Sequence, residues 1–177
     1  MDMTEEQATS GFSAVVREAT AEDAGALYAL ALELADALGD RGPRREAARA
    51  RLLELLEESR ARVLVAEDED GVVGAASLWI KPDLAHGDTV VEVPMLVVSK
   101  NARRRGIGKL LVEKIQSIAA AENAALIELV AARENDTARA FYRSLGFIET
   151  DHIALEFVGD MQDPPEPEQA QHSDPGA

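Results

Sequence analysis

The sequence predicts an α/β (α+β) domain in which a central mixed sheet carries helices on both faces. Residues 62–67 and 72–80 are apolar, β-branched runs on either side of an Asp-Gly turn, which is the pattern of an antiparallel hairpin. Residues 90–98 form a long apolar run that is followed by a helical pattern over 107–122 and a strand over 125–131. That strand–helix–strand unit is a right-handed crossover, so its two strands are parallel. Both kinds of pairing in one chain make the sheet mixed.

Periodicity and helix-start residues predict the other elements. Leucines spaced by three and four residues follow Thr20, with Asp23 at the third helical position, and this indicates a helix that ends near Gly39. The expected order is βααβββαβαβ. The elements not yet placed are a strand over 12–17, helices over 20–39, 43–60 and 136–145, and a final strand over 147–158.

Length and composition predict one domain over residues 12–158, with a flexible lead-in over 1–11 and a disordered acidic tail over 159–177. The absence of cysteine excludes a disulfide scaffold, a thiolate zinc site and a cysteine nucleophile. No apolar run approaches the ~18 residues of a membrane span. The acidic N-terminus does not resemble a secretory signal, so we expect a cytoplasmic protein.

Charge is distributed unevenly along the chain. The formal net charge of −15 disfavours nucleic acid and anionic membranes as partners. Yet six of the 18 Lys and Arg residues lie between positions 100 and 114. An anionic ligand is therefore expected to bind there.

The segment Arg103–Lys109 connects the strand at 90–98 to a helix that begins at Gly106. A helix N-terminus offers unpaired N–H groups to an anion, and Gly106 and Gly108 would let phosphates approach the backbone. A Walker loop is excluded because Arg103 occupies the position of its first glycine. The plainer alternative is a turn whose arginines are simply solvated.

Two segments resemble the GNAT superfamily of N-acetyltransferases. Arg103-x-x-Gly106-x-Gly108 resembles its (Gln/Arg)-x-x-Gly-x-(Gly/Ala) signature. Residues 135–147, with Asn135, Ala138, the Phe-Tyr pair at 141–142 and a Gly-Phe end, resemble the family's Asn-x-x-Ala-x-x-Phe-Tyr-x-x-x-Gly-Phe segment. The resemblance covers about residues 12–158. It implies a GNAT-like, mostly antiparallel sheet of six to seven strands.

The resemblance also implies acetyl-CoA as co-substrate. In this family the glycine turn, here the segment Arg103–Lys109, binds the pyrophosphate, and the preceding strand end pairs with pantetheine. Pro94 supports a strand that parts from its neighbour there, because proline in a central strand marks a bulge. Val98 is the candidate N–H donor to the oxyanion of acyl transfer. The implied cofactor-binding residues are Leu96, Val97, Val98, Arg103, Arg104, Arg105, Gly106, Ile107, Gly108, Lys109, Asn135 and Tyr142.

Tyr142 resembles the general acid of the family, which protonates the departing thiolate. Tyrosine has an ordinary pKa of ~10, above the ~8.5 of a thiol, so it is protonated at neutral pH and can donate. The alternative for Tyr142 is aromatic packing beside Phe141 and Phe147. Asn135 either contacts the pantetheine arm or simply caps a helix.

Glu92 is the candidate general base. It interrupts an apolar run eleven residues before Arg103, a spacing at which some family members carry a catalytic glutamate, and burial would suit it to base catalysis. An exposed charge, a structural ion pair, a water chain, His86 or His152 are the alternatives. Trp79 either packs in the core or lines the acceptor pocket.

The remaining expectations concern ligands and partners. Acidic residues in the expected acceptor region (Glu33, Asp36, Asp40 and Asp83), together with the net charge, favour a cationic amine as acceptor. No histidine pair has metal-ligand spacing, so no metal is expected. A homodimer through the apolar final strand remains open. A catalytically silent acyl-CoA sensor is the alternative function, and a phosphate- or nucleic-acid-binding module is disfavoured by the acidic remainder.

Overall fold

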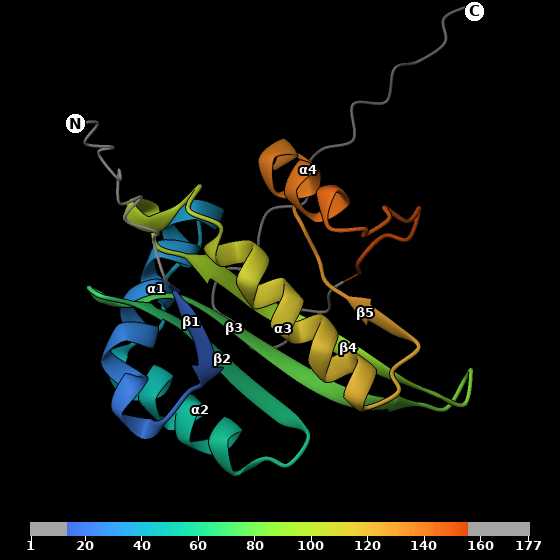
Figure 1. Cartoon of the computed structure of the whole chain (residues 1–177), viewed down its shortest axis with the longest axis horizontal. Coiled ribbons are helices and arrows are strands. Elements are labelled where there is room, and N and C mark those ends of the chain that lie inside the picture. The colour runs from blue at the N-terminus through green and yellow to red at the C-terminus, as the bar shows by residue number, and fades with distance from the viewer. Residues whose placement is uncertain (1–13, 156–177) are drawn as a thin grey trace, which may run out of the picture.

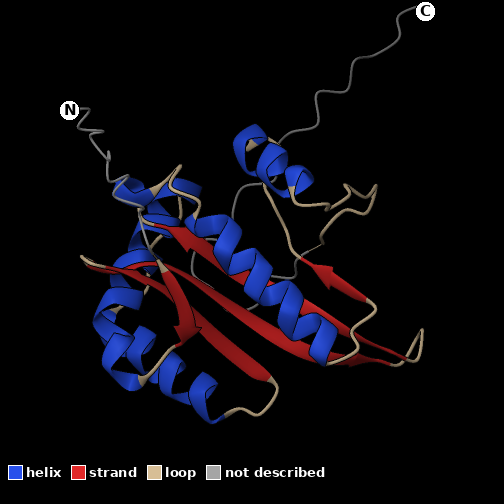
Figure 2. Cartoon of the chain, viewed as in Figure 1, coloured by secondary structure: helices blue, strands red, loops and turns tan. Residues whose placement is uncertain are grey.

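One sheet of five strands, in the order β1-β2-β3-β4-β5, organises residues 14–155, the part of the chain that this computed structural model describes (Figures 1 and 2). Pairing is antiparallel from β1 to β4 and parallel between β4 and β5. The strands are β1 (Val15–Glu18), β2 (Ala61–Asp68), β3 (Gly71–Asp83), β4 (Asp88–Val98) and β5 (Leu126–Glu128). The helices are α1 (Ala24–Leu38), α2 (Arg45–Glu57), α3 (Ile107–Ala121) and α4 (Asp136–Ser144), with short 3₁₀ turns at Ala21–Asp23 and Lys100–Ala102.

Helices cover both faces of the sheet, as the sequence predicted (Figure 2). On one face the apolar stripe of α3, including Ile107, Leu111 and Ile115, packs on alternate residues of the central strands, such as Leu64 and Leu78. On the other face α1 and α2 pack on the intervening residues. Because successive strand residues point to opposite faces, strands buried on both sides must be apolar throughout.

Local signals in the first half of the chain predicted the observed structure well. The Asp-Gly hairpin forms with Gly71 at φ 109°, and α1 ends at Gly39 with φ 76°. Both values lie in the left-handed region that glycine tolerates. Asp23 accepts a hydrogen bond from the Thr20 N–H at 2.7 Å and closes the helix start.

The predicted strand over 147–158 is wrong within the described residues, because 147–155 contain no strand and the described sheet has five strands rather than six to seven. Ile148, Ile153 and Leu155 are 85%, 71% and 86% exposed. Apolar residues in this segment predicted a strand, but a strand also needs a neighbour with which to share hydrogen bonds. Residues 156–158, like the predicted lead-in (1–11) and acidic tail (159–177), lie outside the described residues.

Candidate active site

Strands β4 and β5 pair over only three residues and then part. Glu92 faces Glu128 in the last pair, after which β5 ends while β4 continues to Val98. β3 stays paired with β4 as far as Val98. Among residues 14–155, the other edge of β4 from 93 to 98 therefore has no strand beside it. Such an edge can pair with an extended ligand.

A bulge lies where the two strands part. The pairs Ser77–Met95 and Trp79–Glu92 leave two residues of β4 opposite one of β3, and one of the two is Pro94. Proline cannot donate to the ladder, so the irregularity falls where the sequence predicted it.

The open edge of β4 presents backbone N–H groups. The Ser99 N–H donates to the Val73 carbonyl of β3 at 2.9 Å. Because neighbouring residues of a strand point their N–H groups to opposite sides, those of Leu96 and Val98 point toward the open edge. The Val98 carbonyl lies on the same side and accepts a hydrogen bond from Arg103 Nε at 3.2 Å. Val97, between them, buries its side chain against α1 and α2.

The turn after β4 holds two residues in the left-handed region, Arg104 at φ 63° and Gly106 at φ 82°. Gly106 is the N-cap of α3, and a Cβ built there would meet no atom within 4 Å. Glycine is thus needed here for its backbone angle. The first bond of α3 runs from Leu110 to the Gly106 carbonyl at 3.1 Å, so the N–H groups of residues 107–109 precede it and suit an anion.

The predicted cationic cluster assembles around this turn, but its side chains have different roles. Arg103 and Arg104 are exposed. Arg105 instead turns toward the β2–β3 hairpin, where its Nη2 lies 3.3 Å from Asp68 Oδ2. Lys109 pairs with Glu113 along α3 at 3.7 Å. Ile107, although predicted as a cofactor contact, buries its side chain in the core (1% exposed), which leaves its backbone for a ligand.

Gly108 joins the two segments that resemble the GNAT family. A Cβ at Gly108 would lie 3.0 Å from the Phe141 ring, so the missing side chain makes room for α4. The sequence predicted that Gly108 lets a phosphate approach the backbone, and the contact with Phe141 gives this glycine a packing role. Asn135 caps α4 by accepting from the Ala138 N–H at 3.0 Å, as the plainer alternative predicted.

Tyr142 lies half-buried on α4 between two other aromatic rings. Its ring centroid is 5.1 Å from that of Phe141 and 5.6 Å from that of Phe147. Burial raises the pKa of the Tyr142 phenol, because a low-polarity environment disfavours the phenolate. Tyr142 therefore stays protonated at neutral pH, as a proton donor must. Packing and proton donation are compatible in this arrangement.

Glu92 lies where β4 and β5 part, but it is not buried. Its side chain is 42% exposed, and Lys81 Nζ lies 2.8 Å from Glu92 and 3.6 Å from Glu128. The expected burial is therefore wrong, since Glu92 lies on the sheet face that carries α1 and α2, in a part that these helices do not cover. The hydrogen bond to Glu92 raises the pKa of Lys81. Sequence reasoning missed Lys81 because its distance from Glu92 along the chain hid their cross-strand contact.

Acidic residues expected to attract a cationic acceptor are engaged within the protein. Glu33 accepts from the Ser99 hydroxyl at 2.9 Å and from the Lys100 N–H at 2.7 Å, while Asp36 pairs with Lys100 Nζ at 2.6 Å. These contacts tie α1 to the end of β4 and to the start of the glycine turn.

The proposed alternative bases lie elsewhere. His86 is exposed at the β3–β4 hairpin tip and pairs with Asp83 at 2.5 Å, which raises the His86 pKa. His152 is exposed. Within residues 14–155 no cluster of three or more potential metal ligands is present. Nor does any helix there have the length and apolar character to cross a membrane.

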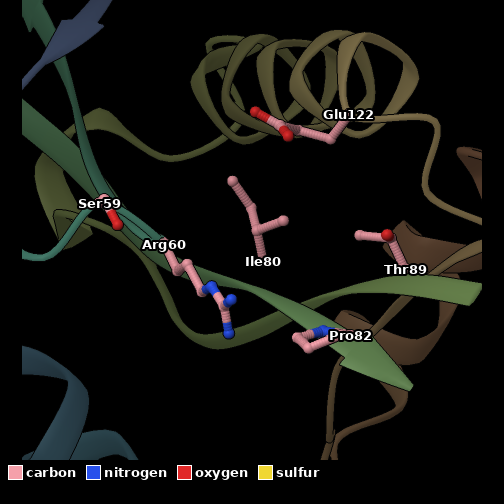
Figure 3. Close-up of a pocket in the computed structure, with 6 residues that line it drawn as sticks. All are labelled: Ser59, Arg60, Ile80, Pro82, Thr89 and Glu122. Carbon is pink, nitrogen blue, oxygen red and sulfur yellow. The ribbon is translucent and has the colours of Figure 1, made fainter. Parts of the chain in front are cut away.

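A separate hollow of about 220 Å³ lies at the far end of α3 (Figure 3). Glu122, which follows the last residue of α3, lines it together with Arg60 and Thr89. Because α3 has 15 residues and rises ~1.5 Å per residue, this hollow is ~20 Å or more from the glycine turn. It belongs to a different part of the molecule from the open edge of β4.

Comparison with known families identifies the family of this chain. The family model described as the acetyltransferase (GNAT) domain matches residues 59–149, just over half of the chain. This protein belongs to the GNAT acetyltransferase family.

Individual relatives share only part of their sequence with this chain. Over 85 residues the chain is 38% identical to a mycothiol acetyltransferase from Beutenbergia cavernae, a match that covers 48% of this chain and 27% of that protein. The chain thus spans about a quarter of that relative's length. A transcriptional regulator from Bacillus halodurans C-125 superposes with a TM-score of 0.75 at 22% identity, over 83% of this chain and 100% of that one. A possible acetyltransferase from Clostridium difficile 630 gives 0.72 at 24% identity, over 82% and 97%. At these identities the two structures show the shared fold alone.

Proposed function

We propose that this protein transfers an acetyl group from acetyl-CoA to a primary amine, on a small and cationic acceptor or on a protein. The observation that carries the proposal is the open edge of β4, which begins beside Glu92 and leads to the glycine-capped N-terminus of α3. GNAT acetyltransferases use acetyl-CoA as co-substrate. An extended arm that ends in a pyrophosphate fits an open strand edge followed by a helix N-terminus.

Both backbone and side-chain groups would bind acetyl-CoA. In this proposal the N–H groups of Leu96 and Val98 pair with the pantetheine arm. The N–H groups of residues 106–109 bind the pyrophosphate, with the exposed Arg103 and Arg104 adding positive charge.

The chemical steps need a base, an oxyanion donor and an acid. Glu92 takes a proton from the acceptor ammonium, after its ion pair with Lys81 opens. The amine attacks the thioester carbonyl directly, and the Val98 N–H stabilises the resulting tetrahedral oxyanion. Tyr142 then protonates the departing thiolate, which its raised pKa permits.

One observation favours a second function. With Glu92 held by Lys81 at 2.8 Å, the proton acceptor of the reaction is occupied. A protein that keeps the cofactor site and loses the base would bind acyl-CoA without turnover and act as a sensor. Turnover of an amine distinguishes the enzyme from this alternative.

The experiment is a panel of amines incubated with acetyl-CoA, scored by release of the free coenzyme A thiol. On an amine that is acetylated, Tyr142→Phe should lower kcat by about 10²–10⁴-fold, because it removes the proton donor and keeps the aromatic packing. Coenzyme A affinity should be unchanged. Tyr28→Phe is the matched control, since Tyr28 lies on α1 and its ring keeps its contact with Arg45. Equal activity of the wild type and Tyr142→Phe would remove the acid role. Cofactor binding with no turnover across the panel would favour the sensor.

A further inference from the structure

The carboxylate of Asp68, at the end of β2, is buried on the side of the sheet that faces the glycine turn. Its side chain is only 1% exposed. Oδ1 accepts a hydrogen bond from the Asp70 N–H at 2.9 Å, as in a tight hairpin. Oδ2 is buried and accepts no hydrogen bond from any residue in the described range 14–155. Nothing in the hairpin itself requires the charge on this second oxygen.

The group that faces Oδ2 belongs to the glycine turn. Arg105 Nη2 lies 3.3 Å from it, and the Arg105 side chain is itself only 33% exposed. The two residues are 37 positions apart in the sequence, so this pair connects the β2–β3 hairpin to the segment between β4 and α3. A charge that is buried without its partner destabilises a protein strongly, and this holds Arg105 in place.

The contact between Arg105 and Asp68 matters because the backbone on both sides of Arg105 has an unusual conformation. The residues on either side, Arg104 and Gly106, both have positive φ, at 63° and 82°. A non-glycine residue in that region is strained and persists only where the surroundings enforce it. Arg105 lies between the two and is attached to the hairpin, so the ion pair is positioned to enforce the turn.

We propose that Asp68 is a positioning residue for the cofactor: through Arg105 it holds the turn at 103–106 in the shape that presents the N–H groups of α3 to a pyrophosphate. The inference rests on the proposed function and extends it. It also distinguishes the three arginines, because the Arg105 guanidinium is directed toward Asp68, while Arg103 and Arg104 are left to meet the phosphates. Sequence reasoning missed Asp68, since its place in Asp-Glu-Asp-Gly marks only a turn.

A double-mutant cycle tests this directly, with coenzyme A as the probe and its Kd measured by calorimetry. Asp68→Asn, which keeps the shape and removes the charge, should raise the Kd about tenfold, equivalent to ~1.4 kcal/mol. Asp70→Asn is the matched control, because it removes the same charge from an exposed residue of the same turn, and it should leave the Kd unchanged. In an Arg105→Gln background, Asp68→Asn should have no further effect, because Asp68 acts through Arg105.

The outcomes separate the possible explanations. An equal loss of affinity in both backgrounds, or no loss in Asp68→Asn, overturns the positioning role. Should Asp68→Asn not fold, Arg105→Gln alone decides the matter: its Kd should rise about tenfold as well, and an unchanged Kd overturns the proposal. If the wild type fails to bind coenzyme A, the proposed function falls and this inference with it. If the wild type binds and Asp68→Asn binds equally well, only this inference is lost.

Discussion

The two helices that follow or carry the GNAT-like segments, α3 and α4, are packed very differently. Ile107, Leu111 and Ile115 of α3 are 1%, 0% and 1% exposed and lie within the larger core. By contrast, α4 contains no buried residue, and the segment that follows it exposes Ile148 and Leu155. In Figure 1, α3 lies along the sheet, whereas α4 lies off the sheet, past the end of β5.

This difference predicts that the part of the candidate site on α3 is preformed. The part on α4 is expected to open locally at a small cost in free energy. The close approach of α3 to the sheet depends on Gly74, whose missing Cβ would lie 3.0 Å from Ile107. For α4, the contact of Phe141 with Gly108 is the corresponding attachment. A segment with few buried contacts opens locally at a small fraction of the global free energy. We therefore expect the glycine turn to be rigid and Tyr142 to sit on the more mobile element.

Core truncations should show the largest contrast between the two segments. Leu111→Ala, in α3, should lower the free energy of unfolding by about 2–5 kcal/mol, because it removes packed atoms and leaves a cavity. Leu155→Ala, at an 86% exposed position, should change it by less than about 0.5 kcal/mol. Urea unfolding at constant protein concentration measures both. A comparable loss for Leu155→Ala would mean that its segment is buried in solution.

The next largest contrast in stability is expected between a buried ion pair, that of Asp23, and an exposed one, that of Glu149. Hydrogen bonds from Arg17 at 2.8 and 2.9 Å, followed by those from Thr20, lower the pKa of Asp23 from its ordinary 3.8 to about 2. A carboxyl group whose pKa is lowered on folding stabilises the fold at pH values above its unfolded-state pKa. The contribution of Asp23 to the free energy of unfolding should therefore be lost as pH falls from about 4 to about 2. Asp23→Asn should cost about 2 kcal/mol at pH 7, the free energy of that pKa difference.

Glu149, the exposed counterpart of Asp23, provides the control. Arg139 lowers its pKa too, through a pair at 2.6 Å, but both side chains are in contact with solvent. Glu149→Gln should leave the melting temperature nearly unchanged, since water screens exposed pairs. Thermal melts from pH 2 to 7 would contradict the comparison if the two substitutions had equal effects.

The smallest change in stability is expected from substitutions at the contact between Phe141 of α4 and Gly108 of α3. Gly25 and Gly108 are each the second residue of a helix, but only Gly108 has a neighbour where a Cβ would be. Gly25→Ala should stabilise the protein by about 0.5–1 kcal/mol through helix propensity. Gly108→Ala should lose that gain and lower turnover several-fold, because its methyl group displaces Phe141 and with it Tyr142. Adding Phe141→Leu should restore part of the turnover. Equal effects of the two alanine substitutions would show that α4 does not depend on this contact.

Much of the fold could be predicted because its signals are local. The Asp-Gly hairpin, the leucine spacing of α1, the bulge at Pro94 and the helix start at Gly106 each depend on a few adjacent residues. A strand depends on a partner, and the apolar character of the last segment predicted one that residues 147–155 do not form. The predicted burial of Glu92 was wrong for a related reason, since its position on a strand did not reveal how much of its sheet face α1 and α2 cover.

The amino-acid sequence predicted where an anion should bind, since a cluster of arginines before a glycine-capped helix needs only neighbouring residues to form. It also indicated the family, through two short motifs. Which contacts the individual candidate residues make became visible in the folded chain alone. The fold turned Arg105 toward Asp68, placed Phe141 against Gly108, and paired Glu92 with Lys81. The physical reason is that each of these contacts joins residues distant in sequence, so it exists only once the sheet has brought them together.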